Sequence, residues 1–183
     1  MDDQVDTHFS GADFRDEDLS RLRTERVVFD ACDFSGVDMS ESEHNGSAFR
    51  NCTFRRSTLW HSMFRHCSFL GSTFVECRIR PVTLTECDFT LAVIGGADLR
   101  KVDLSDSRLR EAGLVGTDLR GAVLARADLS GARVQGARLD NADLRGARAD
   151  PTFWTTAALR GAKIDLEQAL VFAAAHGLDI HGG

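Results

Sequence analysis

The sequence repeats every five residues over most of its length, and this period limits the folds that the chain can adopt. The repeat is clearest between residues 97 and 147, where a large apolar residue occupies every fifth position and a small residue precedes it by two. A period of five matches neither an α-helix, at 3.6 residues, nor an ordinary strand, at 2.0. An internal repeat this regular predicts a solenoid, in which each repeat packs against its neighbours.

The same phase extends in both directions and gives 32 large positions, here called centres, from Phe9 to Ile164. Of these, 29 are Leu, Ile, Val, Met, Phe or Trp, and the exceptions are Thr24, His44 and Ala149. The large and small positions alternate with polar neighbours, so both are expected to point inward. The position two after the centre holds 11 of the 16 glycines, which predicts a corner with positive φ there.

Phenylalanines indicate how many repeats make one coil, because they recur at every fourth repeat. One series is Phe9, Phe29, Phe49, Phe69 and Phe89, and the other is Phe14, Phe34, Phe54 and Phe74. The third series of centres contains none, so a general abundance of Phe does not explain the pattern. We therefore predict four sides of five residues in each coil, with like residues stacked on like. The 32 centres then make about eight coils, in a rod on the order of 40 Å long.

Four residues depart from the repeat pattern or add an unusual side chain to it. Thr24 and His44 are polar centres separated by one predicted coil, and we expect a bulge or irregular turn at that place. Pro81 occupies a turn position, where an ordinary turn proline and a cis bond are both compatible with the sequence. Trp60 directly follows a centre and should point outward, either as an interface anchor or lying flat over its neighbours.

The five cysteines are expected to be core residues rather than disulfides or metal ligands. They all occupy the small inward position, where Cys behaves as a small apolar residue. A bridge between neighbouring coils, Cys32 to Cys52 or Cys67 to Cys87, is the alternative. The odd number of cysteines and a reducing compartment favour free thiols.

The repeat weakens after residue 149, and the segment from Asp165 to Gly177 has the pattern of a helix of about 11 residues. Asp165 and Gln168 form a capping box, and Gly177 suits the position after the C-terminus. Apolar residues occupy two faces, so the helix needs two partners. The last coil can cover one face, and the other could be covered by the same helix of a second subunit or, in a monomer, by the tail folding back. The candidate dimer residues are Leu166, Ala169, Leu170, Phe172 and Ala173.

A small residue, Asp and Leu recur together, as Ala97-Asp98-Leu99, Ala127-Asp128-Leu129 and Ala142-Asp143-Leu144. This pattern resembles that of the pentapeptide-repeat family over about residues 7–164. The resemblance implies a right-handed quadrilateral β-helix in residues 1–164, capped by a short α-helix and tail in residues 165–183 that join two subunits. Within the family, the chain is similar to the mycobacterial fluoroquinolone-resistance proteins.

The composition and residue spacing favour a protein that binds a partner through its surface over an enzyme. A net charge of −6 argues against nucleic acid as a direct ligand. No apolar run is long enough to span a membrane and no secretion pattern opens the chain, so we expect a cytoplasmic protein away from membranes. No spacing is typical of a nucleophile with its base, and His61 and His66 lack a third metal ligand nearby. The sequence therefore predicts a protein that is not an enzyme and needs no cofactor or metal.

Rows of acidic residues are the remaining candidate for function. Residues 1–48 hold 13 acidic and 4 basic side chains. Rungs about 4.8 Å apart compare with about 3.4 Å between phosphates of one DNA strand, so a rod can present a row of charge roughly like a duplex. The alternative is that Asp before a centre is a turn-adjacent residue, paired with Arg such as Arg100 and Arg120. The candidate partner-binding pairs are Asp13 with Asp33, Asp18 with Asp38, and Asp98 with Asp118.

The resemblance implies a partner that composition and period do not. Mycobacterial members of the family look like DNA mimics that bind DNA gyrase, modulate its activity and lower fluoroquinolone sensitivity. The resemblance thus implies a gyrase-binding homodimer. The alternative is a scaffold of the same fold that binds another cytosolic protein through Trp60 or the first coil.

Overall fold

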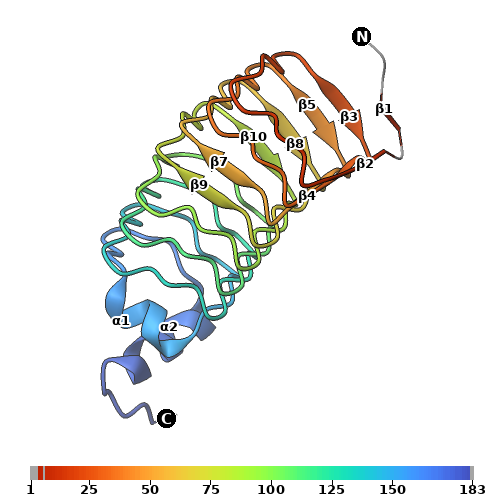
Figure 1. The fold of residues 1–183 in the computed structure, drawn as a ribbon. Helices are drawn as coiled ribbons and strands as arrows, with labels where there is room; N and C mark the ends of the chain where they lie inside the picture. The colour runs from red at the N-terminus through yellow and green to blue at the C-terminus, as the bar shows by residue number, and fades with distance from the viewer. Residues whose placement is uncertain (1–3, 6, 182–183) are drawn as a thin grey trace.

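The computed structural model describes residues 4–5 and 7–181, and it is a β-solenoid whose coils stack into a rod (Figure 1). The parallel pairings of the described residues join positions 20 apart, from Gln4 with Thr24 to Asp143 with Lys163. These pairings fall in four columns five positions apart, such as those at His8, Asp13, Asp18 and Arg23. The predicted coil of four sides, each one repeat long, is therefore confirmed.

Within the described residues, the strands all lie in the first half of the rod. They make a five-stranded sheet in the order β1-β3-β5-β8-β10, a three-stranded sheet β2-β4-β6 and a pair β7-β9. Later coils continue the columns as single bridges, with ladder bonds such as Leu119 N–H to the Arg138 carbonyl at 2.8 Å. The strands are β1 (Gln4–Val5), β2 (His8–Ser10), β3 (Arg23–Glu25), β4 (Val28–Asp30), β5 (Glu43–Asn45), β6 (Ala48–Arg50), β7 (Thr53–Arg55), β8 (Met63–Arg65), β9 (Thr73–Val75) and β10 (Thr83–Thr85).

The corners have the positive φ that the glycine positions predict, with values between +49° and +73°. Many corner residues are not glycine, since Arg26, Asn51 and others adopt the same conformation. At Gly36 a Cβ would also meet the exposed Asp16 carboxylate, which would have to rotate away. Pro81 cannot reach positive φ, and its corner contains a cis Arg80–Pro81 peptide bond.

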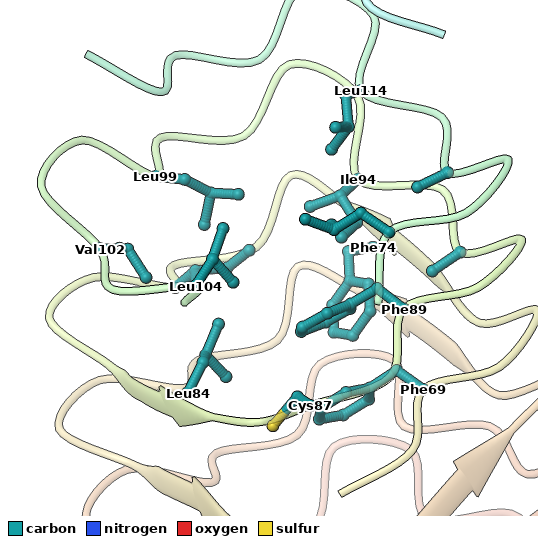
Figure 2. Close-up of a cluster of buried hydrophobic side chains, with 14 of the residues drawn as sticks. Phe69, Phe74, Leu84, Cys87, Phe89, Ile94, Leu99, Val102, Leu104 and Leu114 are labelled. Carbon is teal, nitrogen blue, oxygen red and sulfur yellow. The ribbon is translucent and has the colours of Figure 1, made fainter. Parts of the chain in front are cut away.

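Centres and small residues together fill the axis of the rod, and Figure 2 shows such side chains converging on it from Leu84, Phe89 and Leu104. Phenylalanines stack on the residue 20 positions later, with ring centroids 4.9 Å apart for Phe29 and Phe49. Adjacent columns meet edge to face, as Phe29 and Phe34 do at 5.3 Å. The cysteines are free and lie in or beside this core, as predicted. Because like residues stack on like, the core is continuous along the rod.

The expected bulge at Thr24 and His44 is wrong, because both residues lie in regular strands, β3 and β5, and both are buried. Their polar atoms satisfy one another across coils: Thr24 Oγ1 lies 2.6 Å from His44 Nδ1 and 2.9 Å from Ser47 Oγ. The other ring nitrogen, His44 Nε2, lies 3.0 Å from Ser42 Oγ. The serines of the small column thus provide the partners that allow polar centres inside a straight ladder.

Two helices close the C-terminal end of the rod (Figure 1). The predicted helix is α2 (Leu166–Ala175), and its capping box between Asp165 and Gln168 is confirmed. The Gln168 amide also donates to the Leu144 and Ala147 carbonyls, at 2.6 and 2.8 Å, and so ties α2 to the last coils. The other helix, α1 (Pro151–Thr156), was not predicted, although the sequence carries a signal for it in the Pro at the first turn after Asp150.

Candidate partner-binding surface

The three predicted acidic ladders exist, since Asp13 pairs with Asp33, Asp18 with Asp38 and Asp98 with Asp118 across neighbouring coils. Each Asp before a centre also has a local role. Its carboxylate accepts the backbone N–H two residues later, at 2.9 Å from Ser20 to Asp18 and at 2.8 Å from Ser40 to Asp38. This bond explains why the repeat favours Asp at that position whatever the surface does.

Asp98 and Asp118 are neutralised by arginines. Asp98 contacts Arg100 at 2.7 Å and Arg80 at 3.0 Å. Asp118, which is buried, contacts Arg120 at 2.7 Å and Arg138 at 2.8 Å. These guanidinium groups hold the pKa of both carboxyls below the ordinary value. Four cations share two carboxylates, so this part of the surface carries no net negative charge.

The ladders of the first coils are more exposed and less neutralised. Asp13 binds Arg15 at 2.6 Å, and this hydrogen-bonded ion pair lowers the pKa of Asp13 to about 2. Asp18 and Asp38 are exposed, and among the described residues no basic side chain lies within ion-pair distance of either. The hydrogen bonds from Ser20 lower the pKa of Asp18 below its ordinary value. Asp18 and Asp38 therefore form the acidic ladder most available to a partner.

Helix α2 provides a second surface. Leu166 and Leu170 are 77% and 45% exposed, whereas Ala169, Phe172 and Ala173 are half-buried. Phe172 packs towards the core and lies 6.4 Å from Trp154 between ring centroids. Leu178 in the following tail is also exposed, and the described part of the tail leaves Leu166 and Leu170 uncovered. An apolar strip is left at the C-terminal end of the rod.

Two features of the described residues concern reactive chemistry, the placement of possible metal ligands and the state of the cysteine thiols. No three His, Cys, Asp or Glu side chains gather as a metal site within residues 4–5 and 7–181. Burial raises the pKa of the Cys52 and Cys67 thiols to about 12, so both are protonated and poor nucleophiles. Neither α1 nor α2, the helices of the described chain, could cross a membrane.

The parallel pairings thus define a solenoid in which each coil of 20 residues has four sides with outward-facing side chains. Models of the pentapeptide repeat match residues 7–43, 84–124, 107–146 and 122–153, and a second model matches residues 29–73. The chain therefore belongs to the pentapeptide-repeat family.

Known proteins place the chain more closely within the family. It is 81% identical over 58 residues to the pentapeptide repeat protein MfpA of Mycolicibacterium smegmatis, a match that covers 32% of this chain and 30% of that protein. It is 69% identical over 62 residues to MfpA of Mycobacterium tuberculosis, which covers 34% of each. The chain thus spans about a third of the length of these curated relatives in the matched segments.

A solved structure confirms the fold over nearly the whole chain. A trypsin-treated variant of QnrB1, a plasmid-mediated fluoroquinolone resistance protein, superposes with a TM-score of 0.85. The superposition covers 98% of this chain and 90% of QnrB1 at 21% sequence identity. At that identity the likeness concerns architecture alone.

Proposed function

We propose that this protein binds DNA gyrase as a non-catalytic mimic of DNA, modulates its activity and protects it from fluoroquinolones. The observation that carries the proposal is the exposed ladder of Asp18 and Asp38 on coils whose residues 1–48 hold 13 acidic and 4 basic side chains. Identity to MfpA over a third of the chain and the fold shared with QnrB1 support it. The proposal includes a right-handed rod of about eight coils.

The acidic part of the proposed contact is the N-terminal end of the rod rather than its whole length. Arginines neutralise Asp98 and Asp118 within the protein, so these carboxylates have little charge left for a partner. Asp18 and Asp38 keep theirs. A basic DNA-binding surface is therefore expected to recognise the first coils.

The test compares two matched double variants in a gyrase supercoiling assay, with and without ciprofloxacin, over a salt titration. Asp18→Ser with Asp38→Ser should weaken binding about tenfold, because two exposed charges are lost while Ser can still accept the turn N–H. Asp98→Ser with Asp118→Ser, the control, should weaken it less. Equal losses would place the contact elsewhere, and the absence of any effect of the wild-type protein at low salt would remove gyrase as the partner.

We further propose that two subunits associate through α2, which would cover the exposed Leu166 and Leu170. Leu166→Glu with Leu170→Glu should convert the dimer to a monomer, because charges in an apolar interface are costly to desolvate. Sedimentation equilibrium measures the mass directly. Leu91→Glu, at a 51% exposed corner on the side of the rod, is the control and should leave the mass unchanged. A wild-type monomer would contradict the proposal.

A further inference from the structure

One side of the rod changes the sign of its charge part-way along. This side carries two runs of bridges, Asp18–Asp38–Thr58–Arg78 in the first coils and Asp98–Asp118–Arg138 in the later ones. Its first two coils present Asp18 and Asp38, and the next coil presents Trp60, which is 47% exposed. From the following coil to that of Arg138, the basic residues beside the centres of this side (Arg78, Arg80, Arg100, Arg120 and Arg138) outnumber the acidic ones (Asp98, Asp118 and Asp140). Since the whole chain has a net charge of −6, this basic region is a local feature and not a consequence of the average composition.

A depression of about 520 Å³ lies where the sign changes. We call it the Trp60 groove, and its lining residues are Thr58, Trp60, Cys77, Arg78, Ile79, Arg80 and Asp98. A second depression, of about 480 Å³, shares Arg80 and continues past Pro81 to Lys101, and its lining also includes Glu86, Asp103 and Asp106. The groove therefore combines an exposed indole with two guanidinium groups, and it opens at the corner formed by Pro81.

The positive charge of the groove is not satisfied within the protein. Arg80 and Arg100 bind the same Asp98 carboxylate, at 3.0 and 2.7 Å, so one acid serves two cations. Arg78 has no carboxylate within ion-pair distance among the described residues. The same holds for Lys101 at the far side of the second depression, again within the described part of the chain. The groove thus holds one guanidinium without an acidic partner in the described chain, Arg78, beside Arg80, which shares the Asp98 carboxylate with Arg100.

We propose that the Trp60 groove binds an acidic, extended segment of a protein partner. A carboxylate of that segment lies between Arg78 and Arg80, because guanidinium groups bind carboxylates through paired hydrogen bonds. An apolar side chain of the segment packs on the Trp60 indole, which provides a large and rigid contact. A polynucleotide is disfavoured, since it would extend onto Asp18 and Asp38 on the same side, whereas a short peptide stays within the groove.

The test uses the blocked pentapeptide EEFEE as the probe and Trp60 as the reporter. Trp154→Phe in the full chain leaves Trp60 as the single tryptophan, and it removes a buried indole N–H that lacks a partner in the described structure. The proposal predicts a saturable change in Trp60 fluorescence that weakens as salt rises. Calorimetry with the wild-type chain measures the same binding without the substitution. No saturable signal by either method would overturn the proposal.

Matched variants decide whether the groove is the site. Arg78→Ala should weaken peptide binding about tenfold, because a charge-assisted contact is lost. Arg50→Ala, an exposed cation in the column that carries the β2-β4-β6 sheet, should change it less than about twofold. Equal weakening by both would show diffuse attraction and overturn the proposal.

Two further measurements distinguish an acidic peptide from other possible ligands of the groove. Tighter binding of a five-nucleotide oligothymidylate than of the peptide would reassign the groove to phosphate. A concentration-dependent Trp60 signal without peptide, lost in Arg78→Ala, would reassign it to a second copy of this chain. Either result would overturn the proposal, and neither depends on whether the protein binds gyrase.

Discussion

Replacing Phe49 with alanine should lower the free energy of unfolding by about 3–5 kcal/mol, the range for deleting a large buried aromatic ring. Phe49 is fully buried at the middle of the phenylalanine stack. Its ring lies 4.9 Å from Phe29 and 5.3 Å from Phe69 between centroids, and it meets Phe34 edge to face at 5.7 Å. A cavity there has neighbours on the coils above and below, and neither can collapse into it without breaking its own ladder.

Chemical denaturation at constant pH measures this loss, and Phe9→Ala is the matched control. Phe9 belongs to the same column but lies in the first coil, is only half-buried and has a stacked ring on one side, Phe29 at 5.2 Å. Its loss should cost under about 2 kcal/mol. If the two variants lost equal stability, stacking from both sides would contribute nothing beyond ordinary burial.

His44 should make the protein less stable as the pH falls from neutral. Burial lowers the pKa of His44 from 6.5 to about 3, so between these values the unfolded chain binds a proton that the folded chain does not. Stability from this group is complete above pH 6.5, and it decreases by about 1.4 kcal/mol per pH unit as the pH falls towards 3. Between pH 7.5 and 4.5 the loss is about 3 kcal/mol.

The measurement compares unfolding free energies at several pH values in two variants. Ser42→Ala with His44→Phe removes the titrating ring together with the hydroxyl that binds it, and Phe keeps the ring that stacks on Phe64 at 4.7 Å. This variant should lose most of the pH dependence above pH 4.5. Ser42→Ala alone should keep it, and parallel pH profiles of the two variants would refute the role of His44.

The regular part of this fold follows from the sequence because it depends on backbone spacing. A period of five fixes the corners, and the recurrence of Phe29 and Phe49 fixes the coil length, so the ladder register could be predicted residue by residue. The capping box of Asp165 and Gln168 is likewise local. These features require only that every coil repeat the one before it.

The structure corrects or completes the sequence analysis where side chains of different coils interact. Thr24 and His44 looked like defects, since the sequence did not reveal that Ser42 and Ser47 would satisfy them. Asp98 and Asp118 were predicted to bind a partner. Arginines two residues away and on neighbouring coils pair with both carboxylates and so reduce the negative charge that they present to a partner. The contacts of Arg80 with Asp98, which is distant in the sequence, depend on rotamers that a repeat pattern does not specify.

The four-column register has a consequence for how chain length and surface orientation are linked. Adding or removing one whole coil of four repeats leaves each later side chain on its original side. Adding or removing a single repeat moves every later side chain to the next side of the rod. If the change falls between Asp18 and Trp60, the first-coil ladder and the Trp60 groove no longer share a side. The number of residues between two surface features therefore determines whether they lie on the same side of the rod. Natural insertions that preserve a shared binding side should come in units of one whole coil.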